Sequence, residues 1–81
     1  MTQGEQKFID GVWYLSINGE WQNLEQMKPE DRHRAYSYAS KDTLANERDR
    51  LLGRNKRKIM LRLWNEAKII AIIIDEIEAH L

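Results

Sequence analysis

The last third of the chain places the strongest constraint on its fold, because its apolar residues repeat every seven positions. Two interleaved series share this spacing: Met60, Ala67, Ile74 and Leu81, and Leu63, Ile70 and Ile77. Together they occupy the a and d positions of three heptads, the pattern of an α-helix with one apolar seam. The β-branched run at 69–74 favours a strand locally, but the seven-residue period predicts a helix, which we place at 55–80.

The same helix carries more apolar residues than one seam requires. Leu61, Ile69 and Ile72 lie on other sides of it, so it is apolar nearly all round, as buried helices are. Leaving isoleucine in water forfeits roughly 1.5–3 kcal/mol per side chain, so we expect a second partner, most simply another copy of the chain. The alternative is that the chain's other elements wrap this helix completely. The residues that we expect at an oligomer interface are Leu63, Ile69, Ile70, Ile72, Ile73, Ile74 and Ile77.

Two turn signals near the start of the chain predict a β-hairpin. Asn18-Gly19 separates the β-branched and aromatic run 12–17 from a second run at 20–24. Asn-Gly favours the type I′ turn that joins two paired strands. Asp10-Gly11 is a further signal of this kind, which would add a third short strand, Phe8-Ile9.

A two-residue loop fixes which residues face one another across the hairpin. Ile17 then pairs with Glu20, and Ser16 pairs with Trp21. One face collects apolar residues and is the expected core face: Trp13, Leu15, Ile17 and Leu24. The other face brings Tyr14 diagonally next to Trp21, within reach for large rings. We interpret Tyr14 and Trp21 as candidate protein-binding residues; the alternative is that helices cover this face too.

Good helix formers after the hairpin predict a first helix over 29–52. Pro29 suits its first position, and acidic residues follow where the helix dipole favours them. Residues 40–43 are a candidate break, because their side chains favour caps and turns. Gly53 is the expected turn between the two helices. The alternative is one helix that runs through Gly53, at a cost of about 1 kcal/mol relative to alanine.

The expected fold is therefore α+β, mainly α: an N-terminal β-hairpin followed by two α-helices that form a helical hairpin. The 81 residues make one small domain, 1–81. Within it we expect a flexible N-terminus at 1–7, the β-hairpin at 8–25, and the helices at 29–52 and 55–80.

Charge is unevenly distributed, although the chain is neutral overall. Residues 41–62 hold eight Lys/Arg against three Asp/Glu, whereas the flanks are acidic. Such a segment predicts contact with nucleic-acid phosphates or with an acidic protein surface. The alternative is a solvated helix turn, balanced by the acids at 75–78 of a neighbouring copy. The candidate binding residues are Arg48, Arg50, Arg54, Lys56, Arg57, Lys58 and Arg62.

The sequence offers little for catalysis or metal binding. It contains no cysteine, which excludes a disulfide scaffold, a thiolate nucleophile and cysteine-bound zinc. Glu76 and His80 share a helical face, but two ligands alone do not make a metal site. No glycine-rich phosphate loop occurs. We therefore expect no catalytic, cofactor or metal site and no small-molecule substrate.

We expect a non-enzymatic interaction protein that binds and modulates a macromolecular partner, as an inhibitor, adaptor or regulator and as a homo-oligomer. The inference to this class rests on size and on the missing catalytic residues. The alternative is a nucleic-acid-binding regulator, for example one that binds DNA, which would use 48–62. The cysteine-free composition, the polar start and the short apolar runs predict a cytoplasmic location and no membrane partner.

Overall fold

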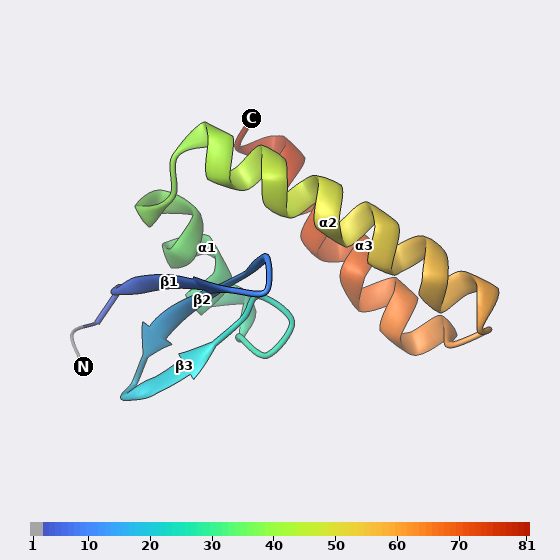
Figure 1. Cartoon of the computed structure of the whole chain (residues 1–81), viewed down its shortest axis with the longest axis horizontal. Coiled ribbons are helices and arrows are strands. Elements are labelled where there is room, and N and C mark those ends of the chain that lie inside the picture. Colours follow the sequence, from blue (N-terminus) through green and yellow to red (C-terminus); the bar gives the residue numbers. More distant parts are fainter. Residues whose placement is uncertain (1–2) are drawn as a thin grey trace. The chain divides into compact units, whose positions relative to one another are not determined.

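The computed structural model describes residues 3–81, which form one compact unit that ends at Ala39 and a second that spans Ser40–Leu81. Figure 1 shows the elements in chain order: β1 (Gln6–Ile9), β2 (Val12–Ile17), β3 (Glu20–Gln22), α1 (Pro29–Tyr38), α2 (Lys41–Met60) and α3 (Trp64–Ala79). The expected α+β class is confirmed. Each unit is compact by itself, so a single domain over 1–81 stays a prediction.

The first unit begins with a three-stranded antiparallel sheet in the order β1-β2-β3. Both turn signals act as expected: φ is 53° at Asp10 and 77° at Gly11, and 52° at Asn18 and 81° at Gly19. Positive φ at both central residues defines the type I′ turn, whose twist matches that of paired strands. The predicted pairings of β2 with β3 and the third strand are confirmed.

One face of this sheet is the core of the first unit. The side chains of the predicted set are fully buried: Trp13, Leu15, Ile17 and Leu24. Gln6 ties β1 to both of its neighbours: its Oε1 accepts a 3.0 Å hydrogen bond from Trp13 Nε1, and its Nε2 donates one of 3.0 Å to the Tyr38 carbonyl oxygen of α1. The indole nitrogen therefore stays satisfied inside an otherwise apolar core.

The start of the chain is more ordered than we expected for a flexible segment at 1–7. Gly4 N donates to the Ser16 carbonyl oxygen at 3.0 Å, Ser16 N donates to the Glu5 carbonyl oxygen at 2.9 Å, and β1 follows from Gln6. These bonds extend the pairing with β2 beyond the strand itself, so the prediction is wrong for 4–7. The part of it that concerns 1–2 lies outside the described residues.

The prediction of one helix over 29–52 is wrong, because the helix is divided in two beside the candidate break at 40–43, which is confirmed. The backbone at Ala39 is extended, with φ −96° and ψ 147°, and α1 ends before it. Ser40 then caps α2, since its Oγ accepts a 3.2 Å hydrogen bond from Thr43 N. A serine cap satisfies a backbone N–H that the helix itself cannot satisfy, which favours a new start at this position.

Gly53 does not turn the chain, contrary to the prediction, and α2 continues through it to Met60. A helix that began after Gly53 would carry cations in its first turn, where the dipole disfavours them. In the structure Arg57 and Lys58 lie in the last turn of α2, where the dipole favours them. Because α2 continues, the side chain of Asn55 also reaches α3. The favourable position of the cations and this contact together offset the cost of about 1 kcal/mol that glycine imposes inside a helix.

The second unit is the helical hairpin of α2 and α3, with α3 starting at Trp64 instead of at 55. The a and d positions that fall within α3 are buried, as the heptads predict: Ala67, Ile70, Ile74 and Ile77. The outer positions of the series are exposed: Met60, Leu63 and Leu81. The seam thus spans two heptads, because the turn between the helices interrupts it.

Candidate functional site

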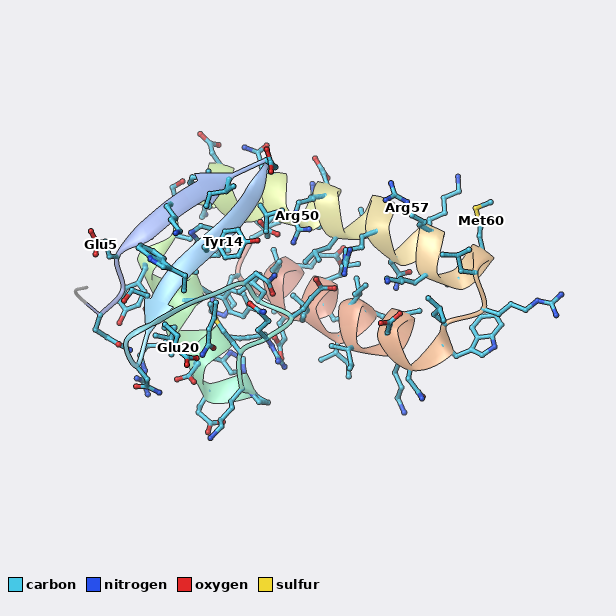
Figure 2. The ribbon with its side chains drawn as sticks, turned by 60° about the horizontal axis from the view of Figure 1, so that its bottom comes forward. Glu5, Tyr14, Glu20, Arg50, Arg57 and Met60 are labelled. Carbon is cyan, nitrogen blue, oxygen red and sulfur yellow. The ribbon has the colours of Figure 1, made fainter. Side chains whose placement is uncertain are left out.

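Large apolar side chains gather in the open where α2 turns into α3. The exposed fraction is 75% for Met60, 62% for Leu61, 41% for Leu63 and 60% for Trp64, and we call these residues the turn-end cluster. Figure 2 shows Met60 at the end of α2 with Arg57 one turn before it, both pointing away from the ribbon of α3. Burial of such side chains is the usual source of binding energy at interfaces.

The backbone between the helices holds these side chains outward. Leu63 N donates to the Lys58 carbonyl oxygen at 2.9 Å, and Arg62 N donates to the Ile59 carbonyl oxygen at 3.0 Å. This pair of bonds is the Schellman end of a helix, in which the residue that donates the shorter-range bond adopts a left-handed conformation. Arg62 takes that conformation with φ 59°, where glycine is the usual residue. The turn is therefore tight, and its apolar residues lie exposed outside the helical pair.

The cluster is surrounded by positive charge. Lys56, Arg57, Arg62 and Lys68 are exposed, and their side chains have no hydrogen-bond or ion-pair partner among residues 3–81. Lys58, in contrast, pairs with Glu66 across the hairpin at 3.2 Å. A shallow open depression of about 380 Å³ lies at this end of the hairpin and is lined by residues 62–66.

The predicted basic segment is only partly available for binding. At least three of its seven cations are held in ion pairs within the second unit, Arg48 with Asp49, Arg50 with Glu47, and Lys58 with Glu66, and Arg54 is half-buried and also has a partner. Arg50 Nε also donates to Glu47 Oε1 at 2.6 Å, and this carboxylate is buried. Lys56, Arg57 and Arg62 remain exposed near the turn-end cluster. The patch that the sequence spreads over 48–62 thus contracts to one end of the hairpin.

Tyr14 and Trp21 lie on one face of the sheet, as the predicted register requires, and both are half-buried. Lys7 of β1 places its Nζ 4.1 Å from the centre of the Trp21 ring on β3. Ser16 lies on the same face of the strand between them, and its small side chain leaves room for this contact. One face of the indole therefore contacts the chain's own lysine, which reduces what a partner could bind.

The residues predicted at an oligomer interface divide into two groups. Four are buried: Ile70, Ile73, Ile74 and Ile77. Three are exposed: Leu63, Ile69 and Ile72. A second copy can therefore reach only the exposed group without opening the chain.

Sequence reasoning missed the turn-end cluster, because it assigned Met60 to the heptad seam and Leu61 to the other side of one long helix. The signal that would have found it is the cationic run 56–58. Cations favour the last turn of a helix, so this run marks the end of α2 near 60. The apolar residues that follow then fall at a turn instead of on a buried face.

Comparison with known proteins adds no relative: no protein-family model, curated protein or solved structure matches the chain. Among residues 3–81, no helix is long and apolar enough to cross a membrane. In the same residues, no three His, Cys, Asp or Glu side chains come together in a way that could hold a metal ion.

Proposed function

We propose that this chain is a non-enzymatic interaction protein that binds and modulates a macromolecular partner, acting as a homo-oligomer. The turn-end cluster would be the surface that contacts this partner. The observation that carries the proposal is the exposure of Met60, Leu61 and Trp64, which are 60–75% open to solvent at the end of a well-packed hairpin. Exposed apolar side chains in one contiguous group typically mark interaction sites.

The surrounding charge indicates what kind of partner would fit. The side chains of Arg57 and Arg62 flank the cluster without partners among the described residues, so an apolar pocket with acidic residues at its rim would complement it. A protein of this kind would act as an inhibitor, adaptor or regulator. We place this binding in the cytoplasm, because the chain uses no cysteine.

A capture experiment with matched variants tests the proposal. The full chain is immobilised, and proteins retained from a cell lysate are quantified by mass spectrometry for the wild type and for Leu61→Ser. Phe8→Ser is the control, because Phe8 is 59% exposed, close to the 62% of Leu61, but lies in the first unit. We expect Leu61→Ser to lose at least one retained protein that Phe8→Ser keeps. Identical sets for the two variants would exclude the cluster as the binding surface.

Nucleic acid is the second candidate partner, supported by the unpaired cations Lys56, Arg57 and Arg62. If all three contact phosphates, log K for duplex DNA should fall against log salt with a slope of about −2.7. Replacing Arg57 and Arg62 by glutamate should abolish this binding. Binding of DNA that survives both replacements, or that shows no salt dependence, would exclude this candidate.

A further inference from the structure

The helical hairpin of the second unit is electrically polarised along its length. Toward the turn, residues 51–74 hold six Lys/Arg, and Glu66, which pairs with Lys58, is their only acidic residue. Toward the open end, residues 41–50 and 75–81 hold three Lys/Arg against six acidic residues: Asp42, Glu47, Asp49, Asp75, Glu76 and Glu78. A negatively charged surface therefore attracts this hairpin by its turn end.

Four exposed cations near the turn-end cluster point in several directions, and we call them the cationic collar: Lys56, Arg57, Arg62 and Lys68. Lys56 and Arg57 are consecutive on α2, so their side chains leave that helix about 100° apart. Arg62 lies in the turn and Lys68 on α3. The positive charge without partners among residues 3–81 is therefore not confined to one face of the hairpin.

The cationic collar lies about one helical turn behind the apolar tip (Figure 2). Arg57 and Lys56 precede Met60 by three and four residues, which is about 4.5–6 Å along α2. Lys68 follows Trp64 by four residues, about 6 Å along α3. Each headgroup layer of a bilayer is about 5–8 Å thick. The tip can therefore reach the edge of the acyl chains while the collar stays at the depth of the lipid phosphates.

The backbone of the turn tolerates such an environment. The N–H groups of Leu61, Arg62 and Leu63 all donate to carbonyl oxygens of α2, at 2.9–3.0 Å, so none of these donors loses a partner when water is removed. Leu63 has no polar side chain to cap the start of α3. The first N–H groups of α3 then favour an anion such as a lipid phosphate.

The side chains of the tip also suit the boundary between headgroups and acyl chains. Tryptophan concentrates at this boundary, because its ring is apolar and its N–H is polar. Trp64 is 60% exposed, and Met60 and Leu61 beside it are aliphatic. Lysine and arginine can lay their stems along apolar surface and still keep the charge among phosphates.

We infer that the turn end of the hairpin binds an anionic lipid surface end-on, with the turn-end cluster inserted among the headgroups and the cationic collar on the lipid phosphates. Lipid is an occupant beyond the protein partner proposed above, and it competes with that partner for the same cluster. The cytoplasmic leaflet carries the anionic lipid that this contact requires. The short apolar runs that predict no membrane partner exclude only a spanning segment, whereas one apolar turn suffices here.

Anionic lipid accounts for more of this surface than nucleic acid or protein does. Nucleic acid would use the cationic collar and stack a base on Trp64, but it would leave Met60 and Leu61 in water. A protein pocket would need acidic residues on several sides of the tip to complement the collar. A bilayer presents phosphates on every side of an inserted tip and covers its apolar residues as well.

Co-sedimentation of the full chain with vesicles tests the lipid contact. The vesicles are phosphatidylcholine alone or phosphatidylcholine with about 30% phosphatidylserine. We expect binding to the mixed vesicles only, at least about tenfold weaker in about 1 M salt, where the Debye length falls to about 3 Å. A chain that binds neither vesicle would overturn the inference. If that chain binds duplex DNA, the collar is a nucleic-acid surface instead.

Lys56→Gln and Lys41→Gln test which end of the hairpin makes the contact. Both lysines are exposed on α2, their side chains have no partner among the described residues, and 15 residues, or about 22 Å, separate them. One cation close to an anionic surface contributes about fivefold to the affinity. We expect that loss for Lys56→Gln and less than about twofold for Lys41→Gln. Equal losses would overturn the end-on orientation.

Trp64→Ala and Phe8→Ala test the insertion of the tip, since the two side chains are 60% and 59% exposed. We expect Trp64→Ala to weaken binding to the mixed vesicles at least about tenfold and Phe8→Ala less than about twofold. Circular dichroism establishes that each variant is folded. Equal affinities of the two variants would mean that the collar adsorbs the chain without insertion, which would overturn the inserted tip.

Tryptophan emission gives a second reading of the insertion. Vesicles should shift the emission of the wild type to the blue, because Trp64 leaves water, whereas Trp13 is already buried. Trp64→Phe keeps an apolar ring and should keep most of the binding but lose this shift. A shift that persists in Trp64→Phe would overturn the placement of Trp64 in the bilayer. The lysate experiment above detects retained proteins and not lipid, so the two proposals can fail separately.

Discussion

The side-chain amide of Asn55 on α2 donates a 2.7 Å hydrogen bond to the carbonyl oxygen of Ala67 on α3. This bond joins the two helices close to the turn, and Asn55 is half-buried. Asn55 is also the residue that a turn at Gly53 would have removed from α2. This hydrogen bond therefore depends on the continuation of α2 beyond Gly53.

Asn55→Ala should lower the free energy of unfolding by about 1 kcal/mol, because it deletes one partly buried hydrogen bond. Urea unfolding followed by circular dichroism measures this change. Asn65→Ala is the control, because Asn65 is exposed and its side chain has no hydrogen-bond partner among residues 3–81. Equal losses for the two variants would show that the bond to Ala67 contributes nothing.

Ser40→Ala should destabilise the chain by about 1 kcal/mol, because the Ser40 Oγ is the side-chain cap of α2. Thermal unfolding of the two proteins measures the difference. Ser37→Ala should change the stability by less than about 0.5 kcal/mol, since among residues 3–81 the Ser37 hydroxyl bonds only to the Arg34 carbonyl of its own helix. If Ser40→Ala unfolds at the same temperature as the wild type, the break between α1 and α2 does not depend on this cap.

The sheet was predictable in detail because its determinants are local. Asn18-Gly19 fixes the turn, the turn fixes the register, and the register decides which residues share a face. Trp13, Leu15 and Ile17 are buried together, as the register predicts. Each step involves residues that are close in sequence, so no knowledge of the remaining fold was needed.

The helix ends were less predictable, because they depend on competition between small effects. Gly53 disfavours the helix by about 1 kcal/mol, and contacts of Asn55 and Lys58 with α3 outweigh this cost. Those contacts are tertiary and cannot be read from the sequence near Gly53. The turn-end cluster was missed for the same reason, since the heptads continue through Met60 as if no turn followed.

Lys7→Met should lower the free energy of unfolding by about 0.5–1 kcal/mol, because it removes the charge that lies 4.1 Å from the Trp21 ring centre. Methionine keeps most of the apolar stem, so the loss reports the cation–π contact more than the packing. Chemical denaturation monitored by tryptophan fluorescence measures it. Lys28→Met is the control, since Lys28 is exposed and its side chain has no partner among the described residues. An effect of the same size at Lys28 would assign the loss to net charge.

Arg62→Gly should stabilise the chain by about 0.5–1 kcal/mol. Arg62 has φ 59°, and a left-handed backbone costs a residue with a Cβ roughly 1–2 kcal/mol, of which the greater freedom of glycine in the unfolded chain offsets a part. Arg57→Gly is the matched comparison, because it removes the same side chain inside the last turn of α2 and should instead destabilise by about 1 kcal/mol. Urea unfolding of both variants gives the two signs directly. If both substitutions destabilise, the conformation of Arg62 carries no strain, and the turn between α2 and α3 tolerates arginine as well as it tolerates glycine.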